Sequence, residues 1–576
     1  MNNRGVAIRY GDVAPEAKEN FIPTASESEF DTLAQLGHYN LDFPNYANPC
    51  ELYQMVLDGT AAAFPSVPEK SNLGLWSEQI SNGDGTFTTP IVLELESTGQ
   101  YSSQGLTLTF DTYNGIFAKR LSIKWLRTTD EGITILDEKE YNPDNAFYFC
   151  RNRVENYNKV VITFYSLNMP KNRLKLRVID YGYGTFFYGD ELRGVKLIQE
   201  IDPISTQISI NTADFTLDSK SDIEYSFQAK QPLSVYFNGE LKATTFVKKS
   251  TRKAKRLWSI QSEDYIGLLD SIPYYGGIYT NKNAVELLTD IFAVAKVPYS
   301  IDDVFANVTV AGYIPFTTCR DALMQVAFAI QAVVDTSNSE VVKVFALEDD
   351  VKQTIPLNRI MQGQNFADEE TVTGVEVAVH SYKPITETID VYDANESGTG
   401  ESIFVKFSEP LHDLSIINGE ITQSGTNYAV INANKDCVLR GQRHEHTTQT
   451  RRKNNPIVLA SEIEKVVAIE NATLVSQYNV DNVLNKCYDW LTRTGSTNLK
   501  IVEGKHEQKN TIKYGQKKYG TFKYGGKILT TTKDEPVAVG EKIVAQTEYL
   551  GNVEGRVVKQ TFNLNGGIVI KDSVLI

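Results

Sequence analysis

Hydrophobic and polar residues alternate with a period of two along much of the chain, which is typical of half-buried β-strands. Between residues 81 and 190 these runs recur with Gly, Asn, Asp and Pro between them. The runs are 91-IVLELE-96, 105-GLTLTF-110, 121-LSIKWL-126, 133-ITILDEKEY-141, 159-KVVITFY-165 and 174-LKLRVIDY-181. Their number and spacing predict an all-β sandwich over residues 81–190.

The same alternation predicts two further β blocks, at residues 191–275 and 511–576. The first block contains 233-LSVYFNGELKATTF-246, in which Asn238 and Gly239 separate two alternating strands. Asn-Gly tolerates the positive φ angles of a type I′ turn, so this segment is predicted to be a hairpin. In the second block, 565-NGG-567 separates two alternating runs in the same way.

Helical periodicity appears in the middle of the chain. Apolar residues in 284-AVELLTDIFAVA-295 lie on one helix face, and Asn283 with Glu286 resembles a capping box. A second helix is predicted after Thr318, followed by a hairpin, which gives an α/β helix-hairpin subdomain over 276–360. Residues 361–510 are predicted as a β domain with a helix near 480–494, and residues 1–80 as an extended N-terminal arm.

Composition and charge restrict the class of protein. The chain has 576 residues, of which 10% are aromatic, and a net charge of −15. An acidic chain is a poor candidate for gripping a phosphate backbone over a wide face, so no stable nucleic-acid binding is expected. The longest apolar run, 322–334, is too short for a membrane span, which needs about 20 residues. We therefore predict no membrane anchor, and a mainly β fold with α+β subdomains.

Two basic segments are candidates for contacts between subunits. In 513-KYGQKKYGTFKYGGK-527, Lys517, Lys518 and Tyr519 could hold a nucleic acid, but a five-residue spacing places successive Tyr residues on opposite faces of a strand. A Gly-kinked β segment at a subunit interface is the alternative. In 248-KKSTRKAKR-256, the side chains of Lys248, Lys249 and Arg252 could contact an acidic neighbour, or could form a solvated face.

Aromatic residues in the 81–190 sandwich have two interpretations. Trp125, Tyr141, Tyr148 and Tyr157 could stack on the faces of sugar rings and bind a host cell-wall glycan. The alternative is that these rings fill the hydrophobic core, because large rings are the first to be buried. The sequence leaves both interpretations open.

Motifs for metal binding and catalysis are not found. His444 and His446 lack an evident third ligand, and the surrounding segment 439–455 is interpreted as a polar, basic loop. The five Cys residues are widely spaced, and the chain contains no HExxH, GxSxG, P-loop or GxGxxG pattern. We expect no catalytic residue, no cofactor and no metal, and therefore no enzyme.

Six segments together resemble the tail-tip baseplate hub proteins of long-tailed phages. They are 4-RGVAIRYGDVAPEAKENF-21, 198-IQEIDPISTQISINTADFTL-217, 232-PLSVYFNGEL-241, 262-SEDYIGLLD-270, 320-RDALMQVAFAIQAVVDTS-337 and 560-QTFNLNGGIVIKD-572. In addition, residues 81–190 resemble a discoidin-like or carbohydrate-binding jelly roll that is inserted into the hub.

The resemblance implies a homotrimer in which each subunit supplies two tube-like β domains, at 191–275 and 511–576, so that three subunits imitate a sixfold ring around a DNA exit channel. It implies that distal tail and tail tube proteins, the tape-measure protein and tail fibre or receptor-binding proteins are partners. The expected location is the virion tail tip or baseplate, after synthesis in the host cytoplasm. The alternative function is a glycan-binding adhesin that acts through residues 81–190.

Overall fold

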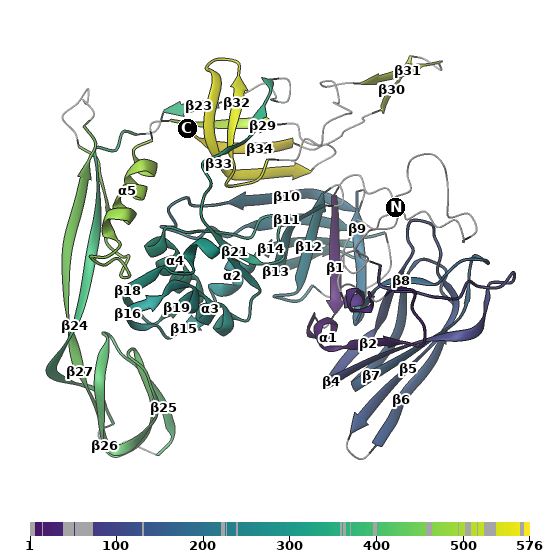
Figure 1. Ribbon diagram of the computed structural model, residues 1–576, viewed down its shortest axis with the longest axis horizontal. Helices are drawn as coiled ribbons and strands as arrows, with labels where there is room; N and C mark the ends of the chain where they lie inside the picture. Colours follow the sequence, from purple (N-terminus) through teal and green to yellow (C-terminus); the bar gives the residue numbers. More distant parts are fainter. Residues whose placement is uncertain are drawn as a thin grey trace. The chain divides into compact units, whose positions relative to one another are not determined.

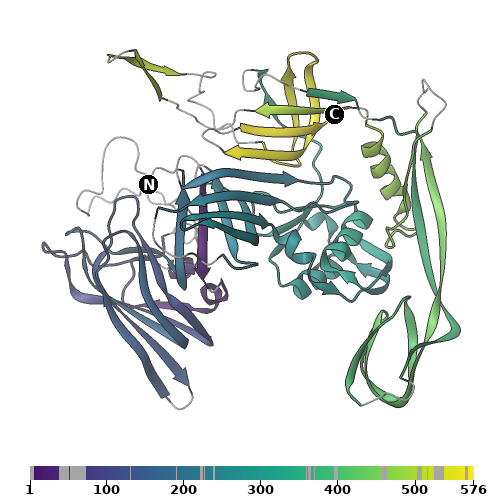
Figure 2. The same ribbon diagram turned by 180° about the vertical axis from the view of Figure 1, so that it is seen from behind.

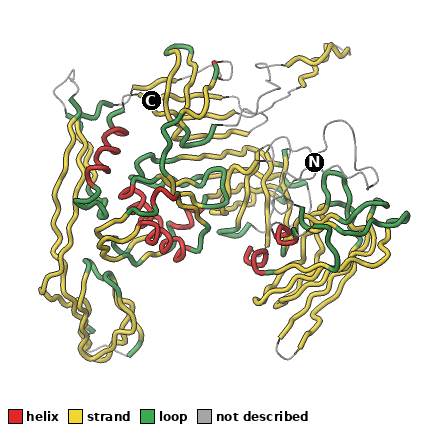
Figure 3. Tube along the Cα trace, in the orientation of Figure 1, coloured by secondary structure: helices red, strands yellow, loops and turns green. Residues whose placement is uncertain are grey.

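The computed structural model is mainly β, with a few short helices (Figures 1 and 3), in agreement with the fold class predicted from the sequence. It folds into two compact units, Met1–Glu191 with Ser219–Leu241 and Leu192–Asp218 with Lys242–Ile576. The structure describes residues 6–13, 15–30, 32–37, 51, 73–129, 132–189, 191–220, 225, 227–237, 240–357, 360, 365–368, 370–394, 400–456, 464–493, 495–501, 509–514, 517–523, 537–564 and 569–576.

A seven-stranded sheet forms most of the first unit. Its strands are β2 (Ile22–Ala25), β3 (Leu75–Trp76), β4 (Thr86–Phe110), β5 (Ala118–Thr129), β6 (Gly132–Tyr141), β7 (Phe147–Leu167) and β8 (Lys175–Asp180). They are ordered β3-β8-β4-β7-β5-β6, and β2 pairs with β4. Strands β4 and β7 pair with four register shifts between them, and such irregularities bend a strand. The buried alternate residues, such as Ile91 and Leu93, join one hydrophobic core.

A second group of strands in the first unit contains the N-terminal segment. Strand β1 (Val6–Val13) pairs antiparallel with both β9 (Gly182–Tyr188) and β12 (Pro232–Phe237). The Tyr10 side chain lies among the rings of Phe187, Tyr225 and Phe227. The helices α1 (Pro15–Asn20) and η1 (Leu33–Gly37) follow β1. Part of the predicted extended arm is thus regular structure.

The second unit contains a long sheet. Its strands include β10 (Leu192–Glu200), β11 (Thr212–Asp218), β13 (Glu240–Ala254), β14 (Leu257–Glu263), β22 (Val351–Ile355), β23 (Asn365–Asp368), β29 (Gly495–Ile501), β32 (Lys542–Thr547), β33 (Gly551–Leu564) and β34 (Val569–Leu575). The order is β13-β14-β11-β10-β33-β34-β29-β23, and β32 pairs with β33 and, in parallel, with β22. Asn238 and Gly239 and the turn at 565–567 lie outside the described residues.

An α/β subdomain follows strand β14. Its elements are α2 (Tyr265–Leu269), β15 (Pro273–Tyr274), β16 (Gly277–Asn283), α3 (Ala284–Ala295), β17 (Tyr299–Ile301), η3 (Asp303–Phe305), β18 (Thr309–Ile314), β19 (Thr317–Thr318), α4 (Cys319–Ile330), β20 (Val333–Asp335) and β21 (Val342–Phe345). The predicted helix at 284–295 is confirmed, and the side chain of Asn283 accepts hydrogen bonds from the amides of Val285 and Glu286. Thr318 caps α4 by accepting from the amide of Asp321.

A long β arm completes the second unit. It comprises β24 (Gly374–Asp393), β25 (Ser402–Lys406), β26 (Leu411–Ser424), β27 (Tyr428–Asn454) and β28 (Val466–Ile469). Helix α5 (Val480–Leu491) packs beside β24, as Figure 2 shows from behind. The prediction of a loop at 439–455 is wrong. Strand β27 continues to Asn454 and pairs with β24 up to that residue. The alternation that marks a strand is weak there because most of these side chains are exposed.

A separate two-stranded sheet is formed by β30 (Lys509–Tyr514) and β31 (Lys517–Lys523). Among the described residues, no helix is long and apolar enough to cross a membrane.

Candidate assembly surface

The pairing of β10 with β33 joins the two β blocks of the second unit. Val195 pairs with Leu564 and Glu200 pairs with Lys559, in an antiparallel ladder without a register shift. The Lys559 ammonium lies 2.5 Å from a Glu200 carboxylate oxygen. The block that ends in β14 and the block formed by β32, β33 and β34 therefore share one continuous sheet.

One face of this sheet is buried. Leu197 on β10 and Phe562 on β33 are paired and almost completely buried, as is Ala213 on β11. Two buried polar side chains on this face are hydrogen-bonded. The Gln199 amide donates to the Lys242 carbonyl over 2.6 Å, and the Gln560 amide donates to the Val537 carbonyl over 3.0 Å. These bonds reduce the cost of burying the two amides.

The opposite face of the same sheet is polar, and we call it the polar sheet face. The registers of β13, β14, β11, β10, β33 and β34 place on it Lys249, Thr251, Ser259, Gln261, Glu263, Thr212, Asp214, Thr216, Lys196, Ile198, Glu200, Lys559, Thr561, Asn563, Lys571 and Ser573. All of them are exposed or half-buried. This set has four lysines and three carboxylates, so the face is nearly neutral. Interleaved carboxylates make it a weak surface for a phosphate backbone.

The predicted interface residues Lys248, Lys249 and Arg252 lie on β13, in the exposed end of its hairpin with β14. The Lys248 ammonium lies 2.6 Å from a Glu263 carboxylate oxygen. The Arg252 guanidinium lies over the Trp258 ring, 5.0 Å from its centroid. The hairpin therefore presents a basic end, in which Lys248 and Arg252 already have partners within the chain.

The other predicted interface residues, Lys517, Lys518 and Tyr519, lie on β31. Lys518 pairs with Lys513 and Lys517 pairs with Tyr514, and the register shifts between Thr511 and Lys513. The segment forms a β hairpin with an irregular ladder. Strand β31 ends at Lys523, and the Tyr524 and Gly525 that follow lie outside the described residues.

The aromatic residues considered for glycan binding lie mainly in the core of the first unit. Trp125 and Tyr157 are 0% exposed and Tyr141 is 6% exposed. The Tyr157 hydroxyl donates to Ser103, and burial raises the pKa of Tyr157 to about 12. Tyr148 is half-buried against the same core. Buried rings present no face to a sugar, so Trp125, Tyr141 and Tyr157 have the core position that the alternative interpretation predicts.

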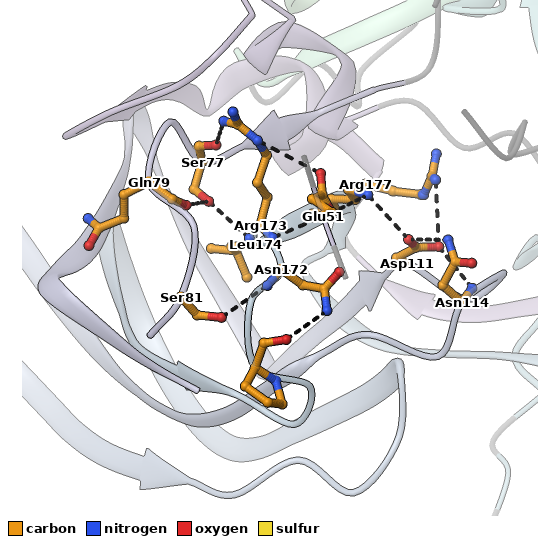
Figure 4. A network of polar contacts seen from close by, with 12 residues as sticks. Glu51, Ser77, Gln79, Ser81, Asp111, Asn114, Asn172, Arg173, Leu174 and Arg177 are labelled. Carbon is orange, nitrogen blue, oxygen red and sulfur yellow. Dashed lines mark hydrogen bonds and ion pairs between the residues drawn. The ribbon is translucent and has the colours of Figure 1, made fainter. Parts of the chain in front are cut away.

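The first unit contains two buried charge clusters that were not predicted from the sequence. In the first cluster the fully buried Glu51 carboxylate lies 2.8 Å from the Lys175 ammonium and 3.8 Å from Arg173 (Figure 4). Asp111 lies 3.9 Å from Lys175 and 3.8 Å from Arg177. The available signal was the presence of Lys and Arg at alternate positions of an otherwise apolar strand.

In the second cluster Asp180 is paired with Arg9 and Lys18. Burial acts to raise the pKa of the Asp180 carboxyl, but the charges and hydrogen bonds of these two side chains hold it at about 2. Like the first cluster, these pairs lie inside the unit and hold segments that are far apart in the sequence.

The histidines of the candidate His-Glu-His segment lie on β27. His446 contacts His380 on β24, with 2.9 Å between His446 Nε2 and His380 Nδ1. His444 contacts the Pro410 carbonyl, and its ring packs edge-on against His412. Among the described residues, no group of three or more His, Cys, Asp or Glu is placed to hold a metal ion. The His380 contact was not predicted because it depends on the strand register.

Comparisons with known proteins give similarity only at the level of solved structures. No family model and no curated protein matches the chain. The chain is similar to the tail protein from Neisseria meningitidis MC58 (TM-score 0.40, 10% identity, 67% of this chain and 92% of that chain). It is also similar to the 43 kDa tail protein of prophage MuSo2 from Shewanella oneidensis (TM-score 0.40, 9% identity, 68% and 95%).

A third similar structure is the prophage tail protein gp18 from Listeria monocytogenes EGD-e (TM-score 0.35, 12% identity, 68% of this chain and 91% of that chain). TM-scores this low carry no argument about function.

Proposed function

We propose that the chain is a structural subunit of a phage-type tail tip, where it acts as a homotrimeric hub. Each copy contributes its two β blocks, and three copies surround the channel through which DNA leaves. The tail tube, distal tail and tape-measure proteins are the proposed partners on the axis, and fibre or receptor-binding proteins are the proposed partners at the periphery. The proposal gives the chain no catalytic role and places it in the virion.

The observation that carries this proposal is the β10–β33 ladder. A threefold assembly can meet a sixfold tube only if each copy presents two similar surfaces. Two β blocks in one continuous sheet have a fixed relative orientation, because the ladder between Val195 and Glu200 on β10 and its partners on β33 has no shift. Two of the sequence segments that resemble hub proteins, 198–217 and 560–572, contain the C-terminal ends of β10 and β33.

The polar sheet face supports a role at the wall of a channel. DNA that passes through a channel must not adhere to its wall, so few unpaired cations are expected there. Of the four lysines on this face, Lys559 is ion-paired, with Glu200, and three carboxylates lie among the four; Lys248, at the edge of the face, is paired with Glu263. The excess of negative charge of the chain is not located on this face, which is nearly neutral.

The subunit count of the purified protein tests the proposal. Native mass spectrometry should give a particle of three times the 64.5 kDa chain mass. Because charged contacts between exposed surfaces weaken with ionic strength, the measurement should be made at low and at high salt. A chain that remains a monomer at high concentration in both solutions, and that is absent from the tail tip of assembled particles, would refute the hub function.

A further inference from the structure

A histidine pair lies at the joint between the β24–β27 arm and the α/β subdomain. His380 Nδ1 and His446 Nε2 are 2.9 Å apart, and His380 Nε2 is 2.9 Å from the Glu470 carbonyl oxygen. Only a donor on His380 Nε2 can bond that carbonyl, so His380 Nδ1 must accept from His446 Nε2. The two rings are nearly coplanar, and their centroids are 5.2 Å apart, as an in-line N–H···N bond requires.

The loop that His380 contacts connects two hydrophobic cores. Leu474 is fully buried in the core of the α/β subdomain, whereas its neighbour Val475 is fully buried against Val375 and Val377 of the arm. The His380 amide also donates to the Val475 carbonyl, over 2.9 Å. Residues 470–476, which we call the joint loop, therefore hold the arm and the subdomain together.

Hydrogen bonds attach the joint loop to the α/β subdomain as well. The Gln325 side chain on α4 donates to the Asn471 carbonyl over 2.7 Å and accepts from the Thr473 amide over 2.9 Å. The Tyr313 amide on β18 donates to the Thr473 carbonyl. These bonds use no ionisable side chain, whereas on the arm side the joint loop is bonded to His380, which in turn contacts His446.

The arm has a second attachment that does not involve a titratable imidazole. The Asn427 amide donates to the carbonyls of Tyr275 and Ile314 over 2.7 and 3.0 Å. Nearby, the rings of Tyr275 and Tyr428 stack with centroids 4.4 Å apart. If the joint loop were released, this attachment would remain, together with the packing of Phe328 of α4 in the same core as Val375 and Val377 of the arm.

We propose that His380 and His446 form an acid-sensitive latch, which holds the joint loop against β24 at neutral pH and releases it when both rings are protonated. One proton is tolerated, because a charged His446 still donates to a neutral His380. A second proton removes the acceptor and places two like charges side by side. His380 is 8% exposed, so its charged form also loses hydration.

The direction of the pH effect follows from linkage. Burial lowers the pKa of His380 below its ordinary value, the Glu470 carbonyl bond opposes this, and the charge of His446 lowers the pKa further. A group whose pKa is lower in the closed state than in the open state favours opening as the pH falls. The ordinary histidine pKa is about 6.5, so the joint is closed above that pH and opens below it.

Several other titratable groups lie around the histidine pair. Burial is the main cause that raises the pKa values of Tyr382 on β24 and Tyr313 on β18 to about 12, so both remain neutral throughout. The Tyr382 ring stacks on His446. Glu409, before β26, is held 2.9 Å from Arg443, and Glu470 contributes its main-chain oxygen. Glu445 is exposed on β27.

Hydrogen–deuterium exchange of the joint loop tests the proposal with the full chain. Protection, corrected for intrinsic exchange, should be highest at about pH 7.5, should begin to fall by about pH 6, and should be about tenfold or more lower at about pH 4.5. The variant His380→Gln should keep its protection at the lowest pH, because glutamine can both donate to Glu470 and accept from His446 without titrating.

Two further variants test the hydrogen bond at neutral pH and provide a control on the same strand. His446→Phe retains a ring against Tyr382 but has no donor, so the joint loop should be less protected already at neutral pH. His444 lies on the same strand as His446 but contacts Pro410 and His412. In the control variant His444→Gln, the protection of the joint loop should therefore equal that of the wild type at each pH. Equal protection of the wild type at all three pH values would overturn the proposal, as would an acid-induced loss that is equally large in His380→Gln.

Discussion

At the scale of single residues, the side chains that were considered for glycan binding are mostly core residues of the first unit. Trp125 has the chemistry of a sugar-binding residue and the position of a core residue. Its alternation with Leu121 and Ile123 along β5 places all three side chains in the same core. The position, rather than the residue type, decides what the side chain does.

Replacing Trp125 should therefore change stability. Trp125→Ala should lower the free energy of unfolding by about 3–5 kcal/mol, through lost burial and the cavity that remains. Denaturant unfolding monitored by circular dichroism measures this change. Ile133→Ala, at a position on the neighbouring strand that is 62% exposed, is the matched control and should be nearly neutral. A Trp125→Ala variant with unchanged stability and lost binding in a glycan array would instead favour the adhesin function.

Asp180 gives a pH-dependent prediction. The pKa of its carboxyl is about 2 in the folded chain, against an ordinary Asp value near 3.9, because Arg9 and Lys18 favour the charged form. The stabilisation is complete above the unfolded value and is lost as the pH falls through the folded value. It amounts to roughly 2–3 kcal/mol.

Urea unfolding of the wild type and of Asp180→Asn, measured from about pH 5 to pH 2, tests this linkage. The two curves should converge at low pH, since the wild type loses the ion pairs that the variant lacks throughout. A constant difference across the whole range would show that the carboxylate charge of Asp180 does not stabilise the fold.

At the scale of elements, the β30–β31 hairpin is the segment whose role is most directly testable. Lys517→Glu with Lys518→Glu should weaken trimer formation, because it reverses two charges that we propose meet an acidic neighbour, and should change DNA affinity little. Lys119→Glu with Lys171→Glu, at exposed positions of the first unit, makes the same change in net charge. Native mass spectrometry and a DNA-binding titration of both double variants separate the two roles. If Lys517→Glu with Lys518→Glu lowered the DNA affinity more than the fraction of trimer, the result would favour nucleic-acid binding.

Elements with a strong local signal could be predicted from the sequence, and those that depend on pairing could not. Helix α3 begins and ends where its cap and apolar period indicate. Strand β27 was mistaken for a loop over its second half, because exposed polar residues from His444 to Asn454 have no alternation, and pairing with β24 determines their conformation.

The candidate site likewise has features that could be predicted from the sequence and features that could not. The two basic segments were visible as runs of charge, and the structure places both on hairpins. The polar sheet face, the His380–His446 contact and the Glu51–Lys175 pair bring together residues that are distant in the sequence. Only the strand registers and the folded core bring these residues together, so the sequence gave no partner for any of them, and its one signal was the Lys and Arg residues at alternate positions of the apolar strand that contains Lys175.

At the scale of the whole molecule, the proposed function depends on the two β blocks that the β10–β33 ladder joins. The net charge of the chain does not predict the charge of the polar sheet face, because the excess of 15 negative charges is not gathered on that face. A nearly neutral wall still satisfies the requirement that DNA does not adhere, provided that cations and carboxylates alternate, as Lys559 and Glu200 do.

A three-dimensional reconstruction of the assembled protein by electron cryo-microscopy tests this account most directly. The account predicts three copies around one axis, six β blocks in the ring, an intact β10–β33 ladder in each copy, and the polar sheet faces towards the channel. A ring in which each copy contributes only one block, or in which the channel wall is formed by the basic end of the β13–β14 hairpin, would contradict it.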